Sequence, residues 1–138
     1  MPQYDAYHET VKRALIKDGW EITDDPFIIE YEDIRLLANL GAEKIFLAAK
    51  GRRKIVVEIK VFGGLSFVND FHRATGQYGN YRSLLRLVHP DVGIYLAVSL
   101  AAYEANFHRP SIQAIVADQG VKLLIFDSER EEITQWIN

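Results

Sequence analysis

The stretch Lys54–Phe62, which reads KIVVEIKVF, constrains the fold of this sequence more than any other segment. It is dense in β-branched residues, which favour a pleated, packed strand. Val92–Val98 is nearly all apolar, as expected of a central strand that is covered on both faces. Amphipathic helical segments lie between these and the other expected strands. The pattern predicts an α/β (α+β) fold with a mixed β-sheet flanked by helices.

The remaining elements follow from helical periodicity, capping residues, and breaks at glycine and proline. In chain order we expect a helix capped by Asp5 and ending at Asp18-Gly19, a strand at Trp20–Thr23, an extended but irregular stretch from Phe27 to about Leu37, strands at Lys44–Ala49 and Lys54–Phe62, a helix from Ser66 to about Val88, a strand at Val92–Val98, helices at Ala101–Phe107 and from Pro110 to about Gln119, and strands at Val121–Asp127 and Glu132–Ile137.

Length and composition predict one domain that spans residues 1–138. The chain has 138 residues and shows no repeat, linker or low-complexity tract. It has no cysteine, which excludes disulfides and thiolate metal sites. The start, MPQYDAYHET, lacks the features of a signal peptide, and the longest uncharged stretch is too short to span a bilayer. We therefore expect a cytoplasmic protein with no membrane partner.

Two charged residues, Glu58 and Lys60, interrupt the strand at Lys54–Phe62. Strand side chains alternate between faces, so these two project to the same side. A charge is costly to bury unless it is paired or bound to a metal. The pair therefore indicates either a simple ion pair on a solvated face of the sheet or a functional site. The pattern E-x-K alone does not separate these interpretations.

A second polar pair lies on the long helix, where Gln77 and Tyr81 are four residues apart and share one face. This spacing is equally typical of polar packing of a helix against a sheet. Basic residues concentrate at Lys50–Lys54 and at a set on the long helix. That set is Arg73, Arg82 and Arg86. The first concentration indicates a solvated hairpin turn, and the net charge of -3 argues against a protein that coats nucleic acid.

These motifs together resemble the PD-(D/E)XK nuclease class, and Gln77 and Tyr81 resemble the Q-x-x-x-Y helix motif of its RecB-like members. More specifically, the sequence resembles the XisH family, the fdxN-element excision controlling factors. The resembling strings are YHETVKRALIKDGWEIT, GAEKIFLAAKGRRKIVVEIKVFGG, FHRATGQYGNYRSLLRLVHPD, YLAV and KLLIFD…EITQWI. They occur in collinear order over essentially the whole chain.

The resemblance implies a restriction-endonuclease-like fold and a role in controlling programmed excision of a DNA element in cyanobacteria. It implies DNA, an XisI-like companion protein and a site-specific recombinase as partners. It also implies a site for Mg²⁺ or Mn²⁺, in which Glu58 is a metal ligand. In that class the lysine, here Lys60, stabilises developing negative charge or positions the attacking water.

One position departs from the family pattern. Where similar sequences read D-L-G-A-E, this chain has Asn39 to Glu43. Asn39 thus replaces the metal-binding aspartate, and an amide oxygen can ligate a hard cation with one negative charge less. Glu43 or Asp33 are alternative ligands, and Glu9 on the first helix is a further catalytic candidate.

Three functions are compatible with these residues. The first is an accessory factor that has a nuclease-like fold and a weakened metal site, and that acts by binding DNA or a companion. The second is an active Mg²⁺-dependent DNA endonuclease that uses Glu58, Lys60, Gln77 and Tyr81. The third is the partner-binding half of a two-protein, toxin–antitoxin-like pair. For an association surface, including a homo-oligomer, the apolar C-terminal residues around Trp136 are the candidate.

Overall fold

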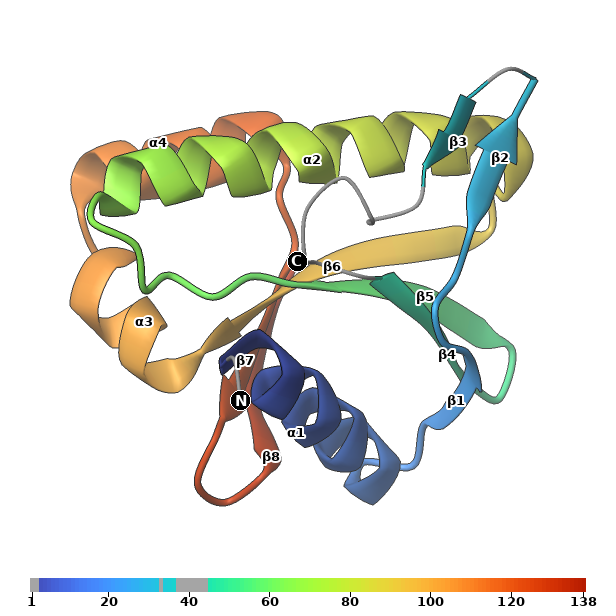
Figure 1. The fold of residues 1–138 in the computed structure, drawn as a ribbon, viewed down its shortest axis with the longest axis horizontal. Helices are drawn as coiled ribbons and strands as arrows, with labels where there is room; N and C mark the ends of the chain where they lie inside the picture. Colours follow the sequence, from blue (N-terminus) through green and yellow to red (C-terminus); the bar gives the residue numbers. More distant parts are fainter. Residues whose placement is uncertain (1–2, 33, 37–44) are drawn as a thin grey trace.

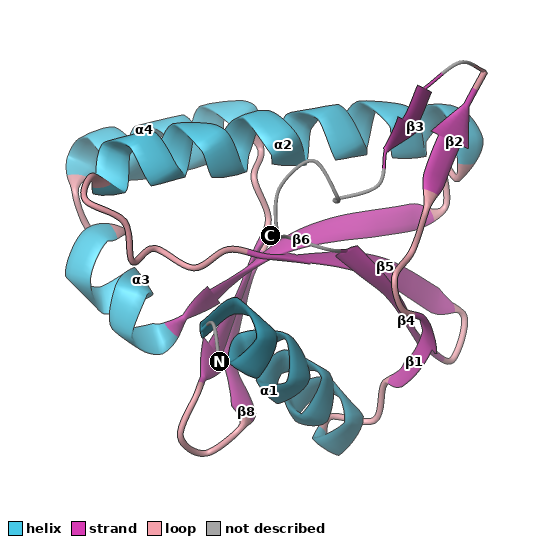
Figure 2. Ribbon diagram, in the orientation of Figure 1, coloured by secondary structure: helices cyan, strands magenta, loops and turns pink. Residues whose placement is uncertain are grey.

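The computed structural model describes residues 3–32, 34–36 and 45–138, and within them it contains four helices and eight strands (Figures 1 and 2). The helices are α1 (Gln3–Lys17), α2 (Phe67–Val88), α3 (Leu100–Asn106) and α4 (Pro110–Gln119). The strands are β1 (Glu21–Asp24), β2 (Ile29–Tyr31), β3 (Ile34–Leu36), β4 (Ile45–Lys50), β5 (Arg53–Ile59), β6 (Val92–Ser99), β7 (Leu123–Asp127) and β8 (Glu132–Ile137).

Six of these strands form one mixed, open sheet in the order β1-β4-β5-β6-β7-β8. The consecutive strands β5, β6 and β7 run parallel, whereas β1, β4 and β8 add antiparallel pairs at the two sides. β5 therefore has a strand on each side, as expected of the Lys54–Phe62 segment. The mixed sheet flanked by helices confirms the predicted fold class.

Helices cover both faces of the sheet (Figure 2). On one face, α1 packs Val11 and Leu15 against a cluster that includes Val57 and Phe126. On the other face, α2 and α4 cover a second cluster. Successive residues of β5 and β6 alternate between these clusters, because strand side chains point to opposite faces. The inner strands are thus buried on both sides, which explains their nearly continuous apolar sequence.

Helix α2 is the long helix that the sequence predicts, with the predicted cap. The side chain of Ser66 accepts a hydrogen bond from the N–H of Asn69 at 3.2 Å, which satisfies one of the free donors of the first turn. The buried face of the helix consists of residues at helical spacing, namely Phe71, Ala74, Thr75, Tyr78, Tyr81 and Leu85. The helix lies across the sheet with this face inward (Figure 1).

Three local predictions are wrong. The first helix begins at Gln3, so Asp5 lies inside it and is not its cap. The helix extends toward the N-terminus beyond Tyr7, the first residue of its apolar pattern, because helical backbone does not itself require burial. β2 and β3 pair as two antiparallel strands, where an extended but irregular stretch was expected. β5 ends at Ile59, three residues before the expected end, although the N–H of Lys60 still donates to the carbonyl of Ala97.

The pairing of β2 and β3 could not be predicted from the sequence, because each strand has only three residues. Ile29 is fully buried beneath α2, whereas Glu30 and Tyr31 are exposed. Glu32 adopts a left-handed conformation at the turn, with φ of 50°. In the described part of the chain, no helix combines the length and apolar content needed to cross a membrane.

Candidate functional site

Glu58 is a buried carboxylate on the central strand β5, with only 2% of its surface exposed. Its neighbours across the sheet are Ile45 on β4 and Leu96 on β6. Both neighbours belong to the cluster beneath α2, and residues paired across strands point to the same face. The Glu58 side chain therefore lies between the sheet and α2. A carboxylate in this environment is costly unless its charge is compensated.

Lys60 is the second buried charge and is 5% exposed. Its N–H donates to the carbonyl of Ala97 at 3.2 Å, which extends the parallel ladder one residue beyond β5. Because side chains alternate along extended backbone, Lys60 lies on the same face as Glu58. The structure thus excludes a solvated ion pair for these two residues. Both charged side chains are buried in the interior.

Helix α2 contributes two polar side chains above this face of the sheet. Gln77 is half-buried, and its Oε1 atom is buried with no hydrogen-bond partner among the described residues. Tyr81 is buried within the cluster beneath the helix. The two are one turn apart, so they share the face that was expected from their spacing. A buried amide oxygen without a donor is able to accept a hydrogen bond from a water or to coordinate a cation.

Tyr78, which the sequence analysis did not single out, fixes α2 to the sheet. Its hydroxyl donates to the carbonyl of Ile94 and accepts from the N–H of Lys122, both at 3.0 Å. Burial raises the pKa of Tyr78, and the negative charge of Glu58 raises it further. Glu58 therefore acts electrostatically on the Tyr78 hydroxyl beneath α2. No sequence signal separates Tyr78 from an ordinary core aromatic residue.

Glu9 is not brought beside Glu58. It lies on the exposed side of α1, where its carboxylate is 3.1 Å from the amine of Lys12. α1 packs on the face of the sheet opposite to α2. The same helix forms a second polar group, in which His8 and Lys12 both contact the carboxylate of Asp25. The sequence does not indicate this group, because Asp25 is 17 residues from His8 and 13 residues from Lys12 along the chain.

The metal ligands expected from the sequence are only partly covered by the structure. Asn39, Glu43 and Asp33 lie outside the described residues. Within the described residues, no three histidine or acidic side chains gather as a metal-binding group. Of the expected ligands, Glu58 alone is therefore placed. A buried carboxylate and the buried amide oxygen of Gln77 are hard oxygen donors of the kind that Mg²⁺ and Mn²⁺ prefer.

Comparisons with known proteins match nearly the whole chain. Residues 1–134 match the family model described as XisH protein. A crystal structure of an fdxN element excision controlling factor protein from Anabaena variabilis is 44% identical; the match covers 97% of this chain and 99% of that one, with a TM-score of 0.89. An XisH family protein from Nostoc punctiforme is 41% identical over 97% of this chain and 100% of its own, with a TM-score of 0.90. None of the curated proteins that were compared matches the chain.

Proposed function

This chain belongs to the XisH family, and we propose that it acts as a controlling factor for programmed site-specific excision of a DNA element. In this proposal it binds DNA through a restriction-endonuclease-like domain that retains part of a metal site. The excision-controlling role is the description of the Anabaena variabilis relative, which shares 44% of its sequence with this chain.

The observation that carries the proposal is the burial of Glu58 on the central strand beneath α2. An acidic side chain that is 2% exposed imposes a large desolvation cost, which a purely structural strand avoids by placing an apolar residue there. Lys60 lies two residues further on and is also buried. Charged groups retained at such positions are more typical of functional sites than of structural ones.

A divalent cation fits the donor set at this position. Glu58 would hold the ion, together with Asn39 and with Glu43 as the further expected acid. A bound Mg²⁺ or Mn²⁺ supplies Lewis-acid polarisation of a phosphate. Lys60 would then place a positive charge beside the phosphate oxygens, and the Oε1 atom of Gln77 would hold a water molecule by accepting its hydrogen bond.

Two versions of this function differ in whether DNA is cleaved. The presence of Glu58, Lys60, Gln77 and Tyr81 in the chain favours an active Mg²⁺-dependent endonuclease. Asn39 in place of an aspartate and the net charge of -3 favour a factor that binds without cleaving. We propose the second version, because the loss of a carboxylate ligand weakens binding of the metal on which cleavage depends.

The test combines DNA binding and DNA cleavage with the substitution Glu58→Gln. Wild type is incubated with supercoiled plasmid in EDTA, Mg²⁺ or Mn²⁺, and binding is measured by fluorescence anisotropy on a labelled duplex. The proposal expects DNA binding in all three conditions and no nicking. Nicking that needs a metal and disappears in Glu58→Gln would establish the endonuclease instead. Absence of DNA binding at low salt would contradict both versions of the function.

The matched control for Glu58→Gln is Glu104→Gln on α3. Glu104 is exposed, so the change removes the same charge without disturbing the interior. Its DNA binding and thermal melting should equal those of wild type. If both variants change DNA binding equally, the effect is one of net charge and not of the Glu58 site.

The proposal also includes protein partners, an XisI-like companion and a site-specific recombinase. The apolar residues of β8 form the candidate surface. Trp136 and Ile137 are only half-buried in the isolated chain, so part of their apolar area is available to a partner. Co-purification of this chain with the companion, followed by light scattering, tests this part of the proposal.

A further inference from the structure

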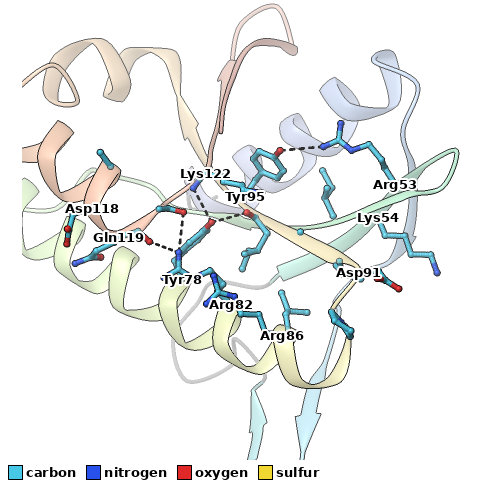
Figure 3. Close-up of a pocket in the computed structure, with 18 residues that line it drawn as sticks. Arg53, Lys54, Tyr78, Arg82, Arg86, Asp91, Tyr95, Asp118, Gln119 and Lys122 are labelled. Atoms are coloured by element: carbon cyan, nitrogen blue, oxygen red, sulfur yellow. Dashed lines mark hydrogen bonds between the residues drawn. The ribbon is translucent and has the colours of Figure 1, made fainter.

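A cleft of about 580 Å³ lies at the amino-terminal ends of β5 and β6 (Figure 3). One wall is the carboxyl-terminal half of α2, another is the start of β5, and the third is the connection from α4 to β7. Neither Glu58 nor Lys60 lines it, so it is separate from the candidate site described above. Its volume falls within the range of about 300–1,000 Å³ that is usual for small-ligand pockets.

The register of the sheet explains why a cleft forms here. β5 and β6 pair from Lys54 and Val92 onward. β7 joins β6 only at Leu96, four residues later. The first half of β6 therefore has no strand on that side, and side chains from α2 and from the end of α4 border the space. The cleft therefore follows from the strand order and register of the sheet.

Positive charge dominates the lining of the cleft. The cations come from three separate elements, as Figure 3 shows: Arg53, Lys54, Arg82, Arg86 and Lys122. Two carboxylates, Asp91 and Asp118, also line the cleft. None of the five cations forms an ion pair with a carboxylate in the part of the chain that the structure describes. This concentration contrasts with the net charge of -3 of the whole chain.

Three of the five cations are held in place by contacts that leave their charge uncancelled. Arg82 donates to the carbonyl of Gln119 at the end of α4 and lies 5.3 Å from the ring centre of Tyr78. The amine of Lys122 lies 5.9 Å from the ring centre of Tyr95. Carbonyl and aromatic contacts stabilise a cation but do not neutralise it. They therefore pre-organise positive charge around the cleft.

Arg53 is held in the same way. Its guanidinium lies 5.5 Å from the ring centre of Trp20 and donates to the hydroxyl of Tyr95 at 3.4 Å. Lys54 and Arg86 are exposed at the cleft and have no such contact among the described residues. Arg53 and Lys122 are also exposed and Arg82 is half-buried, so the positive charge of the cleft is accessible to a dissolved anion.

We propose that this cleft binds a chain of phosphate groups, as carried by a nucleoside triphosphate or by inorganic tripolyphosphate. Cations on three walls match an anion with several charges better than a single phosphate, which contacts only one or two of them. A cleft of this volume favours a small ligand over an extended nucleic-acid backbone. The overall acidic charge also disfavours sliding along DNA. This ligand is independent of the DNA-related function proposed above.

Isothermal titration calorimetry in EDTA at low salt tests the proposal with ATP, tripolyphosphate and inorganic phosphate as probes. EDTA excludes binding through a metal at Glu58, so the result does not depend on the proposed function. We expect one site that binds tripolyphosphate and ATP more tightly than phosphate. Tighter binding of ATP than of tripolyphosphate would identify a nucleotide as the source, and equal binding would identify the phosphate chain alone.

The variant for this test is Arg86→Gln with Lys122→Gln, and the control is Arg73→Gln. Arg73 is an exposed cation of the same helix that does not line the cleft. The double variant should weaken tripolyphosphate binding by at least about tenfold, because it removes two cations that would donate hydrogen bonds to the phosphate oxygens. The control should leave it unchanged. Thermal melting verifies that both variants fold.

Three results would overturn the proposal. The first is absence of binding of ATP and tripolyphosphate at millimolar concentration. The second is equal weakening by the control, which would mean that the anions sense only net charge. The third is binding of a short DNA duplex that depends on Arg86 and Lys122 while ATP and tripolyphosphate do not bind, which would assign the cleft to nucleic acid.

Discussion

Asp25 joins the first helix to the segment after β1 through two side chains of α1. Its carboxylate receives a hydrogen bond from the amine of Lys12 at 2.7 Å and contacts the ring of His8 at 3.0 Å. Partial burial opposes ionisation of Asp25, but the hydrogen bonds from Lys12 and His8 outweigh it and hold the pKa of the carboxyl below its ordinary value. The ionised carboxylate is therefore favoured in the folded protein.

Replacing Asp25 with Asn should lower stability at pH 7 by about 1 kcal/mol, the upper range for a partly exposed ion pair. A depressed folded-state pKa contributes stability above the unfolded pKa of about 3.9, and this contribution is lost as pH falls through the lower folded value. The difference between wild type and Asp25→Asn should thus shrink below about pH 4. Urea unfolding at pH 7, 5 and 3 measures it. A difference that stays constant with pH would assign the effect to packing.

The residue at position 39 is expected to set the affinity for the metal. Replacing Asn39 with Asp restores the carboxylate that the resemblance expects, so Mg²⁺ or Mn²⁺ should bind more tightly by about tenfold. The expected readout is a larger rise in melting temperature with added metal, because a ligand that binds only the folded state stabilises it. The same substitution combined with Glu58→Gln should abolish the gain. No change in metal response would mean that position 39 does not contribute to the site.

At the residue scale the sequence singled out Glu58 and Lys60 as two charges within a buried strand, and both are buried in the structure. Their role as site residues stays a prediction. The sequence could not predict the partners of Asp25. Those depend on the packing of α1 beside the turn at Asp25, which no local pattern encodes. The interpretation of Arg53 and Lys54 as solvated turn residues was incomplete for the same reason, since both line a cleft with residues of α2.

Helix α2 contains two glycines, Gly76 and Gly79, where helix propensity favours other residues. A Cβ atom added at either position would meet no atom within 4 Å. Substitution by Ala should therefore stabilise the protein by about 0.5–1 kcal/mol at each site, because glycine in a helix interior has the larger entropy cost. Urea unfolding of Gly76→Ala, Gly79→Ala and the double variant measures the gain.

Gly64 offers the matched control for these substitutions. A Cβ atom there would lie 2.8 Å from a carboxylate oxygen of Asp70, which accepts a hydrogen bond from the N–H of Gly64. Gly64→Ala should therefore destabilise the protein. If Gly76→Ala is instead less stable than wild type, the exposed face of α2 contacts a group that the isolated chain does not reveal.

At the level of elements, long segments with strong periodicity were predictable and short ones were not. The Ser66 cap and the apolar spacing of α2 fixed that helix to within one residue. β2 and β3 have three residues each, too few for a period to emerge, and they pair because Ile29 packs beneath α2. Tertiary contact, rather than local propensity, decides such elements.

For the whole molecule, Trp136 is the residue on which the association prediction depends. It packs against Tyr95 and Trp20, with ring centres 4.9 and 5.9 Å apart, so it contributes to the core as well as to the surface. Trp136→Ala should lower the free energy of unfolding by about 2 kcal/mol, less than for a fully buried tryptophan. Urea unfolding measures this loss.

Association is then measured by size-exclusion chromatography with light scattering, on the chain alone and with an XisI-like companion. If the wild type is a monomer in both, the interface prediction fails. If it associates, a substitution on the outward side of β8 such as Gln135→Glu, at an exposed residue, separates interface from core. Lost association with unchanged stability would place the interface on β8.

The strand order of the sheet could not be predicted from the sequence, although the fold class could. Parallel pairing of β5 with β6 and of β6 with β7 depends on contacts between segments that are tens of residues apart. The cleft depends on that order and on the late start of β7. Its five cations are spread over the sequence from Arg53 to Lys122, so only the folded chain brings them together.

Helix α2 faces two sites with neighbouring side chains. Gln77 and Tyr81 lie toward the Glu58 site, while Tyr78 and Arg82 border the cleft. Because these residues share one helix of 22 residues, a ligand that displaced α2 at the cleft would displace Gln77 as well. Thermodynamic linkage makes such an effect reciprocal: the two ligands change each other's affinity by the same factor. Coupling between the two sites thus requires a ligand that displaces α2, and its sign would depend on whether both ligands favour the same position of the helix.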